Sequence, residues 1–350
     1  MSQSDKGVLS MLKLSILDQS VAVQGRSHSD SIQATLALAE KAESWGYHRF
    51  WVSEHHSHPT IVGSAPEVLM AAIASRTSRI RIGSAGVMLP HYASLKVAEQ
   101  FRVLDALAPG RIDLGVGRAP GSDQRTSRLL NPDPRSSDNF PRQVQELMVW
   151  TGPQATPDKA RASADSTLYP TAYGVQAFPS STTAPTIWML GSSDYGAQLA
   201  AELGLPYAFA YFITDGQGLE QALDMYRQNY KPSEAHPKPQ ALLCVWALAA
   251  DTEAEAWRLF QSRARARMDR NLGRNTALSS PEDSVREWTP MEERALEQLK
   301  AGAFVGTGGQ VVGKLEALAD KHGIDEIAVI TWTHDPAAQA RSYELLASAL

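Results

Sequence analysis

The sequence predicts an α/β fold, a (β/α)8 TIM barrel with loop insertions after strands 4 and 7, from two observations. Short apolar runs of β type alternate with amphipathic helical segments along the chain, as parallel strands joined by crossover helices require. The residues suited to chemistry follow the C-terminal ends of the second to fifth predicted strands, the rim where barrel enzymes build their active sites.

The alternation predicts eight candidate strands, each of a length that suits one strand of a barrel. They are Leu12–Leu17, Arg49–Ser53, Ile80–Met88, Ile112–Val116, Thr186–Leu190, Tyr207–Ala210, Ala241–Leu248 and Glu326–Thr331. Helices are predicted between and after them, at Pro66–Thr77, Leu95–Leu107, Arg142–Trp150, Asp194–Leu203, Leu219–Tyr230, Thr252–Arg267, Gln310–His322 and Pro336–Leu346.

The helix between the first two strands shows the pattern most clearly. Ile32, Leu36 and Ala39 recur at helical spacing. We expect Ser29 and Asp30 to cap its start, and Gly46 to stop it in a left-handed conformation.

Length and composition fit one barrel domain over residues 1–350, with residues 1–10 expected to be flexible and two ordinary domains as the alternative. A net charge of -5 gives no general attraction for nucleic acid. No apolar stretch reaches the length of about 18 residues that spans a membrane, and no secretion signal is evident, so we expect a cytoplasmic protein. Cys244 lies in an apolar run and is interpreted as a small buried hydrophobe.

Three irregular stretches interrupt the alternation: Ala119–Asn139, Gly152–Pro185 and Met268–Ala303. The first leaves the fourth strand at its C-terminal end. We interpret Ala119–Asn139 and Met268–Ala303 as excursions that enclose a substrate, with an interdomain linker as the alternative.

The densest group of ionisable residues, Glu54, His55, His56 and His58, follows the second strand. Imidazole titrates near working pH, and two adjacent histidines at a strand end can point one ring inward and the other toward an orienting partner. His55 and His56 are therefore the candidate catalytic residues. A metal site and purely structural histidines are the alternatives, although no metal-ligand spacing is evident, so no metal is expected.

Small residues, including Ala85 and Gly86, end the third strand where a barrel usually carries bulky ones. They would let a flat ligand approach the backbone, or they would permit a bulge that needs glycine. The sequence favours neither reading.

Two further segments suit a phosphate group. Arg118 follows the fourth strand, where a guanidinium can clamp phosphate, and Gly191, Ser192 and Ser193 lead from the fifth strand into a helix N-terminus. An exposed turn arginine and ordinary serine capping are the alternatives. Both segments fall on one rim of the predicted barrel, which makes a shared cradle for one terminal phosphate a natural arrangement.

In combination these segments resemble bacterial-luciferase-like flavin-dependent monooxygenases, especially the single-chain group related to the luciferase alpha subunit. The resemblance covers nearly the whole chain. The matching segments, in order, are Glu54-His55-His56, Val87-Met88-Leu89-Pro90, Gly110-Arg111-Ile112-Asp113-Leu114-Gly115-Val116-Gly117-Arg118, Gly191-Ser192-Ser193, Gly204-Leu205-Pro206-Tyr207-Ala208-Phe209-Ala210, Phe304-Val305-Gly306-Thr307-Gly308-Gly309-Gln310 and Gly323-Ile324-Asp325-Glu326-Ile327.

The resemblance implies that a separate flavin reductase supplies reduced FMN, which with O2 forms a C4a-peroxyflavin that oxygenates a small or medium organic substrate. It implies that His55 supports this intermediate, that Arg118, Gly191, Ser192 and Ser193 bind the FMN phosphate, and that a non-prolyl cis peptide lies at Ala85–Gly86 beneath the flavin. It also implies a homodimer. The alternatives are an F420-dependent dehydrogenase or reductase of the same fold, and a flavin-binding protein without catalysis.

One departure from the family pattern concerns the phosphate loop. Gly191 and Tyr195 stand where luciferase itself carries a glutamate and a threonine. Activity on aldehydes, and a side-chain phosphate contact at Tyr195, are therefore not expected to carry over.

Overall fold

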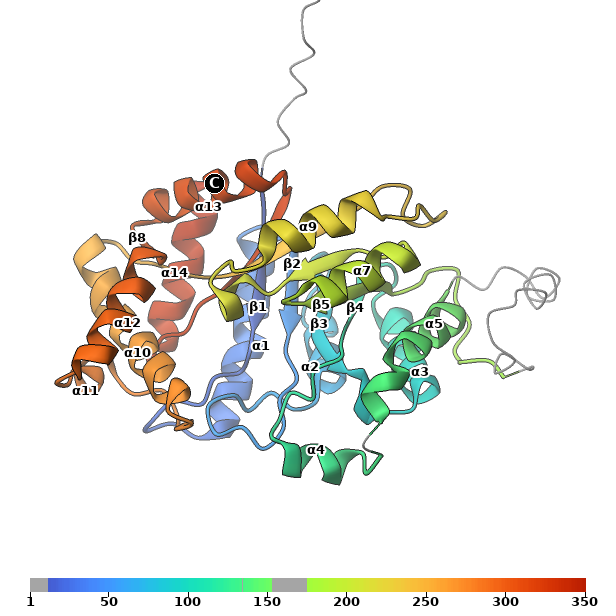
Figure 1. Cartoon of the computed structure of the whole chain (residues 1–350), viewed down its shortest axis with the longest axis horizontal. Coiled ribbons are helices and arrows are strands. Elements are labelled where there is room, and N and C mark those ends of the chain that lie inside the picture. Colours follow the sequence, from blue (N-terminus) through green and yellow to red (C-terminus); the bar gives the residue numbers. More distant parts are fainter. Residues whose placement is uncertain (1–11, 134, 153–174) are drawn as a thin grey trace, which may run out of the picture.

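Eight parallel strands close into a ring in the computed structural model, which describes residues 12–133, 135–152 and 175–350 (Figure 1). Each strand pairs with the next along the ring, and the pairs β6–β7, β7–β9 and β9–β1 complete it. The ring strands are β1 (Lys13–Asp18), β2 (Arg49–Val52), β3 (Arg81–Met88), β4 (Ile112–Gly117), β5 (Thr186–Gly191), β6 (Tyr207–Phe209), β7 (Ala241–Ala249) and β9 (Glu326–Ile330). The predicted barrel and its eight strands are confirmed.

Helices connect the strands and form the outer layer, because a parallel strand needs a crossover to reach its neighbour. The longer ones are α1 (His28–Ser44), α2 (Pro66–Ala74), α3 (Ser94–Leu107), α5 (Phe140–Thr151), α7 (Asp194–Leu203), α9 (Leu219–Gln228), α10 (Glu253–Asn271), α12 (Pro290–Ala301), α13 (Gly308–His322) and α14 (Pro336–Ala349). The short ones are η1 (Leu89–His91), α4 (Gln124–Leu130), η2 (Ser136–Asn139), α8 (Tyr211–Thr214) and α11 (Pro281–Ser284).

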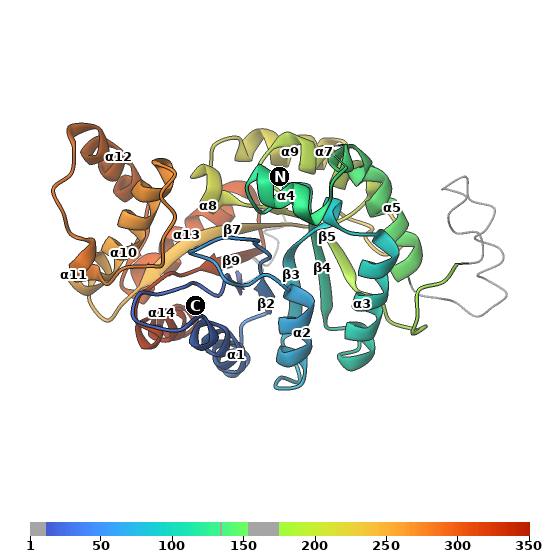
Figure 2. The same cartoon turned by 90° about the horizontal axis from the view of Figure 1, so that it is seen from below.

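A ninth strand, β8 (Phe304–Gly306), was not predicted. It pairs with the end of β7, beyond the residues of β7 that pair with β6. The stretch Met268–Ala303, predicted as an excursion, holds the end of α10 together with α11 and α12. These helices gather at one end of the molecule, opposite α3 and α5 (Figures 1 and 2).

The first helix begins earlier than predicted. Ser27, rather than Ser29 or Asp30, is the N-cap, and its hydroxyl accepts a hydrogen bond from the Asp30 amide at 3.1 Å. Asp30 reciprocates, because its carboxylate accepts from the Ser27 amide at 3.2 Å and so completes a capping box. Gly46 ends the helix with a φ of 82°, as predicted.

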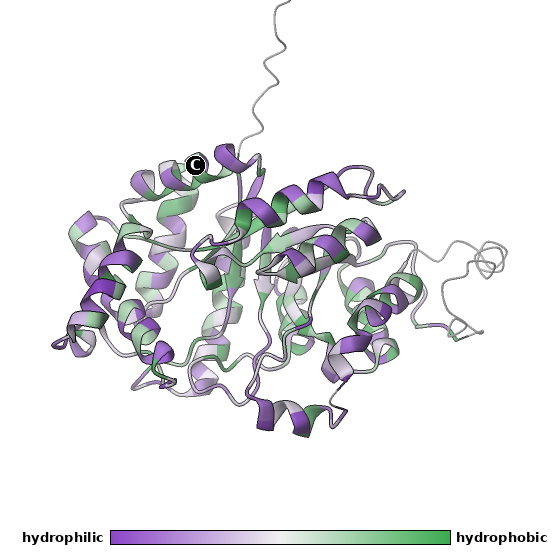
Figure 3. Cartoon of the chain, viewed as in Figure 1, coloured by the Kyte–Doolittle hydropathy of each residue, from purple (hydrophilic) through white to green (hydrophobic). Residues whose placement is uncertain are grey.

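The outer helices turn their apolar sides toward the strands, and Figure 3 shows hydrophilic colour on their outward sides. Inside the ring, two tryptophans and a charged network fill the barrel. Arg49 donates to Asp113 at 2.8 Å and to Glu326 at 2.9 Å, and Trp51 donates to Asp113 at 3.0 Å. Because these side chains fill the interior, the largest ligand-sized space among the described residues lies toward the barrel mouth.

The less regular parts of the chain are only partly described by the structure. The stretch Ala119–Asn139 contains α4 and η2, while most of Gly152–Pro185 and the whole of residues 1–10 lie outside the described residues. Within the described ranges, no helix combines the length and apolarity needed to cross a membrane.

Candidate active site

A cavity of about 350 Å³ opens at the C-terminal ends of the strands. Every strand of the ring contributes to its wall, through residues near the strand's end or just beyond it. Of the residues selected from the sequence, six line it: His55, Ala85, Gly86, Arg118, Gly191 and Ser192. His56 and Ser193 do not line it. The placement matches the rim position that the barrel prediction required.

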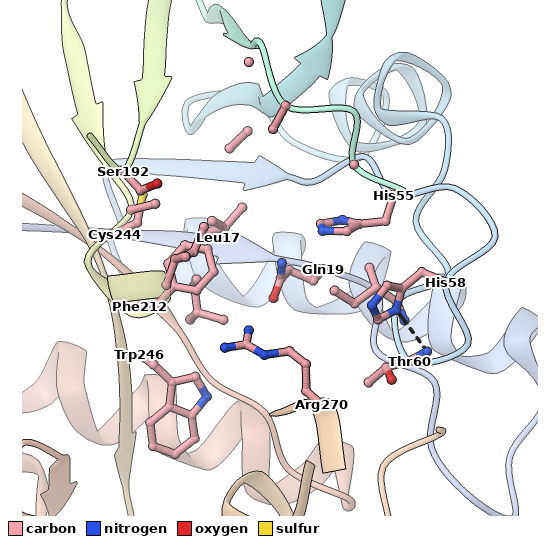
Figure 4. A pocket seen from close by; sticks show the side chains of 18 of the residues that line it. Leu17, Gln19, His55, His58, Thr60, Ser192, Phe212, Cys244, Trp246 and Arg270 are labelled. Atoms are coloured by element: carbon pink, nitrogen blue, oxygen red, sulfur yellow. Dashed lines mark hydrogen bonds between the residues drawn. The ribbon is translucent and has the colours of Figure 1, made fainter. Parts of the chain in front are cut away.

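His55 enters the cavity from the loop after β2 (Figure 4). Its amide donates to the Gly63 carbonyl at 3.0 Å, and its Nδ1 lies 3.3 Å from the Ser53 hydroxyl. Burial, assisted by His58 and His56, lowers the pKa of His55 to about 4. The imidazole is therefore neutral at physiological pH, with Nε2 free of partners among the described residues.

His56 points away from the cavity into a small buried network. Its Nε2 lies 2.7 Å from Oε1 of Glu54, which also accepts from the Tyr92 hydroxyl at 2.7 Å. The other oxygen of Glu54 accepts from the Met88 amide at 3.1 Å. The carboxylate thus ties the His55–His56 loop to the end of β3, and His56 is the member of the pair held by an orienting partner.

The end of β3 forms part of the cavity wall. The peptide bond between Ala85 and Gly86 is cis, as the resemblance implies. A Cβ built on Gly86 would lie 2.7 Å from the Gly115 carbonyl oxygen, so a side chain does not fit there. The pairing of β3 with β4 shifts between Ser84 and Val87, which is the irregularity that one of the two sequence readings proposed.

Arg118 and Tyr195 form one corner of the site. The guanidinium of Arg118, at the end of β4, stacks on the Tyr195 ring near the start of α7, 3.8 Å from the ring centre. Stacking occupies the guanidinium face and leaves its edge donors available. Ser192 and Gly191 from the end of β5 line the same cavity, so the two segments predicted to share a phosphate do meet at one rim.

Ser193 occupies the N-cap position of α7, yet its side chain makes no capping hydrogen bond. Simple serine capping therefore does not explain the segment. The Tyr207 hydroxyl donates to the Ser193 carbonyl at 3.1 Å and fixes the turn. Asp194 lies in the first turn as well, but it is exposed and contacts Gln221 of α9 at 3.4 Å.

His58 also lines the cavity, where its Nδ1 accepts from the Thr60 and Ile61 amides at 3.2 and 3.1 Å (Figure 4). Within the part of the chain that the structure describes, no group of three or more His, Cys, Asp or Glu side chains is arranged to hold a metal ion. Cys244 is buried, as predicted, and burial raises the pKa of its thiol to about 12.

The side of the cavity that α10 builds was not predicted from the sequence. Four arginines line it there, namely Arg263, Arg267, Arg270 and Arg274, and Trp246 of β7 lies against the first of them. Read singly, each arginine looks like an ordinary surface charge. Their spacing of four, three and four residues was the available signal, since it places the first three on one helix face.

A family model described as luciferase-like monooxygenase matches residues 12–326. The chain is 39% identical to a "Luciferase-like monooxygenase" of Escherichia coli, covering 95% of this chain and 96% of the relative. It is 37% identical to an "N-acetyl-S-alkylcysteine monooxygenase" of Bacillus subtilis, covering 97% and 98%.

Among solved structures, apo-MsnO8 is 36% identical, with a TM-score of 0.85, and the match covers 97% of this chain and 98% of the other. Two more distant structures share the fold alone. One is the oxygenating constituent of 3,6-diketocamphane monooxygenase of Pseudomonas putida in complex with FMN, at 20% identity and TM-score 0.68. The other is an F420-dependent secondary alcohol dehydrogenase, at 16% identity and TM-score 0.63.

Proposed function

Because the chain belongs to the luciferase-like monooxygenase family, and is thus an oxidoreductase, we propose that it oxygenates a small or medium organic substrate with reduced FMN and O2. The proposal rests on the cavity at the strand ends. His55, the Ala85–Gly86 peptide, Arg118 and Ser192 all line it. These groups come from four strands that are adjacent in the ring.

The residues present fit FMN in two respects. Gly86 presents bare backbone to the cavity and admits no Cβ, which suits the face of a flat ring. The Arg118 guanidinium and the Ser192 and Ser193 hydroxyls have no hydrogen-bond partner within the described ranges, which suits the terminal phosphate. Free amides at the start of α7 add donors for the same group.

Bound reduced FMN would supply two electrons and two protons, so that one atom of O2 enters the substrate and the other leaves as water, with FMN as the oxidised product. The protein's part is to position the reactants and to exclude water. Leu17, Leu190, Phe212, Trp246 and Ile330 give the cavity an apolar lining suited to that second task.

His55 is placed to manage a proton. Its Nδ1 is oriented by Ser53, and its neutral Nε2 is free to accept a proton or donate one according to the tautomer. Because burial disfavours the charged imidazole, a proton taken up at Nε2 is easily returned. We propose this acid–base function for His55 and a positioning function for His56.

The proposal is tested by the reaction of bound reduced flavin with O2. Protein-bound reduced FMN should be reoxidised by O2 at a rate different from that of free reduced FMN, and a substrate should incorporate one atom from ¹⁸O2. Identical reoxidation with and without the protein, unaltered by any substrate, would instead support a flavin-binding protein without catalysis.

Two partners complete the proposal. We propose a separate flavin reductase as the source of reduced FMN and a homodimer as the state in solution. Exposed Val68 on α2, together with Val103 and Leu107 on α3, supplies apolar surface for a subunit contact. Sedimentation velocity checks the dimer, and a purely monomeric protein at micromolar concentration would contradict it.

A further inference from the structure

One side of the cavity carries a concentration of positive charge. Arg263, Arg267 and Arg270 lie on one face of α10, and Arg274 follows the end of the helix. No aspartate or glutamate is among the described residues that line the cavity. The α10 side therefore attracts anions.

The arginines differ in what they contact. Arg267 donates to Asp215 at 2.6 Å and so is paired. Arg263 and Arg270 form no ion pair with any residue in the described ranges. Figure 4 shows the guanidinium of Arg270 reaching into the cavity between Gln19 and Trp246.

Arg263 is the more unusual of the two unpaired arginines. It is only 7% exposed, and its Nε is buried without a hydrogen-bond partner in the described part of the chain. The Trp246 ring lies 4.1 Å from its guanidinium, which covers one face and leaves the edge donors unused. Although burial lowers the pKa of Arg263 to about 9, the group stays charged at neutral pH. A buried cation without a direct ion pair costs stability, and an anionic group of a bound ligand would offset that cost.

Two neutral donors lie beside these arginines. The indole N–H of Trp246 is buried and has no acceptor within the described residues. The carbonyl oxygen of Gln19 accepts from the Trp332 indole at 3.1 Å, which leaves the amide NH₂ of Gln19 without a partner there. All four groups line the cavity and all are donors, so the matching ligand group is one that only accepts hydrogen bonds.

We propose that the substrate carries a carboxylate, which Arg263 and Arg270 bind while Trp246 and Gln19 complete its hydrogen bonds. The inference rests on the proposed function, because it assigns the α10 side to the substrate and the Arg118 corner to the FMN phosphate. A carboxylate accepts from a planar guanidinium through two parallel hydrogen bonds, and its two oxygens suit the few donors available.

Hexanoate and hexanamide are suitable probes, since they share a chain and differ in the terminal group. Their affinities for the FMN-loaded protein are measured by calorimetry, and the affinity for FMN is measured separately by flavin fluorescence. The variants are Arg270→Ala and Arg263→Met, with Arg265→Ala as the matched control. Arg265 lies on the same helix, pairs with Asp269 at 2.6 Å and does not line the cavity.

We expect hexanoate to bind the wild-type protein more tightly than hexanamide. Arg270→Ala should weaken the binding of hexanoate about 10- to 100-fold and leave the affinities for hexanamide and FMN unchanged. Arg263→Met should weaken hexanoate similarly while raising the melting temperature, because it removes an unpaired buried charge. Arg265→Ala should leave both ligands unaffected.

Equal affinities for the two probes, or Arg270→Ala and Arg263→Met proteins that both bind hexanoate as the wild type does, would overturn the proposal. So would a parallel loss of FMN affinity, which would assign the arginines to the flavin. If hexanesulfonate or hexyl phosphate bound more tightly than hexanoate, the site would be assigned to that anion and not to a carboxylate. Failure of the wild-type protein to bind FMN would count against the proposed function alone, since the hexanoate comparison can still be made on the flavin-free protein.

Discussion

The guanidinium of Arg118 lies over the ring of Tyr195, 3.8 Å from its centre, and joins the end of β4 to the start of α7. No phosphate contact was expected of Tyr195 from the sequence. In the structure its ring packs against one face of the Arg118 guanidinium. The edge donors of Arg118 are thereby left for a ligand.

Replacing Arg118 by alanine should show how much the phosphate group contributes to the binding of FMN. Losing a charge-assisted contact is expected to weaken the binding of FMN by about 1.5–3 kcal/mol. Riboflavin lacks the phosphate, so its affinity should hardly change. Fluorescence titrations with both flavins check the prediction.

The matched control for this experiment is Arg125→Ala. Arg125 lies in the nearby helix α4, is exposed and does not line the cavity, so its loss should affect neither flavin. If Arg118→Ala weakened FMN and riboflavin equally, the arginine would not be a phosphate ligand.

Replacing His55 by alanine should uncouple the reaction without preventing flavin binding. The His55 ring lines the cavity but lies apart from the Arg118 corner in sequence and on the rim. Reduced FMN should still bind and be reoxidised, with less oxygenated product and more hydrogen peroxide per flavin consumed. An unchanged product yield per reduced FMN would remove His55 from the chemistry.

The low pKa of His55 also predicts how stability depends on pH. The unfolded imidazole has a pKa of 6.5, whereas burial lowers it to about 4 in the folded protein. The unfolded chain therefore binds more protons between these values, and stability is lost as the pH falls from 6.5 toward 4. Between pH 7 and pH 5 the wild type should lose about 1–2 kcal/mol more unfolding free energy than His55→Gln. Urea titrations at both pH values measure the difference, and parallel losses in the two proteins would contradict the burial argument.

Gly86 should not tolerate a side chain. A Cβ there would lie 2.7 Å from the Gly115 carbonyl oxygen and 2.3 Å from a Leu190 methyl group, so Gly86→Ala should cost about 1–3 kcal/mol of stability. Gly309→Ala in helix α13 is the control, because no atom lies within 4 Å of the added methyl. It should be neutral or stabilise by up to about 1 kcal/mol. Thermal unfolding compares the two, and equal melting temperatures would argue against the close contact.

The barrel was predictable because its strands are apolar runs that alternate with helical segments. β8 was missed because only Phe304 and Val305 are apolar before the glycine-rich residues Gly306–Gly309, so the strand is defined by its pairing with β7. The start of α1 was misplaced by two to three residues, since three candidate caps, Ser27, Ser29 and Asp30, lie within four positions. Local sequence does not decide which of them the chain uses.

The residues of the candidate site also include some that the sequence predicted and some that it did not. Residues at the ends of β2 to β5 were found because one rim collects them, so position along the chain implied position in space. The arginines of α10 were not found, although their helical spacing was visible, because the sequence does not show which residues surround them. That no aspartate or glutamate is among the described residues lining the cavity follows from the packing of distant segments.

Whether the protein uses FMN is decided by titrating the purified protein with FMN and with F420, since proteins using either cofactor share this fold at low identity. We expect FMN to bind at least about tenfold more tightly, a difference of about 1.4 kcal/mol. A clear preference for F420 would contradict it.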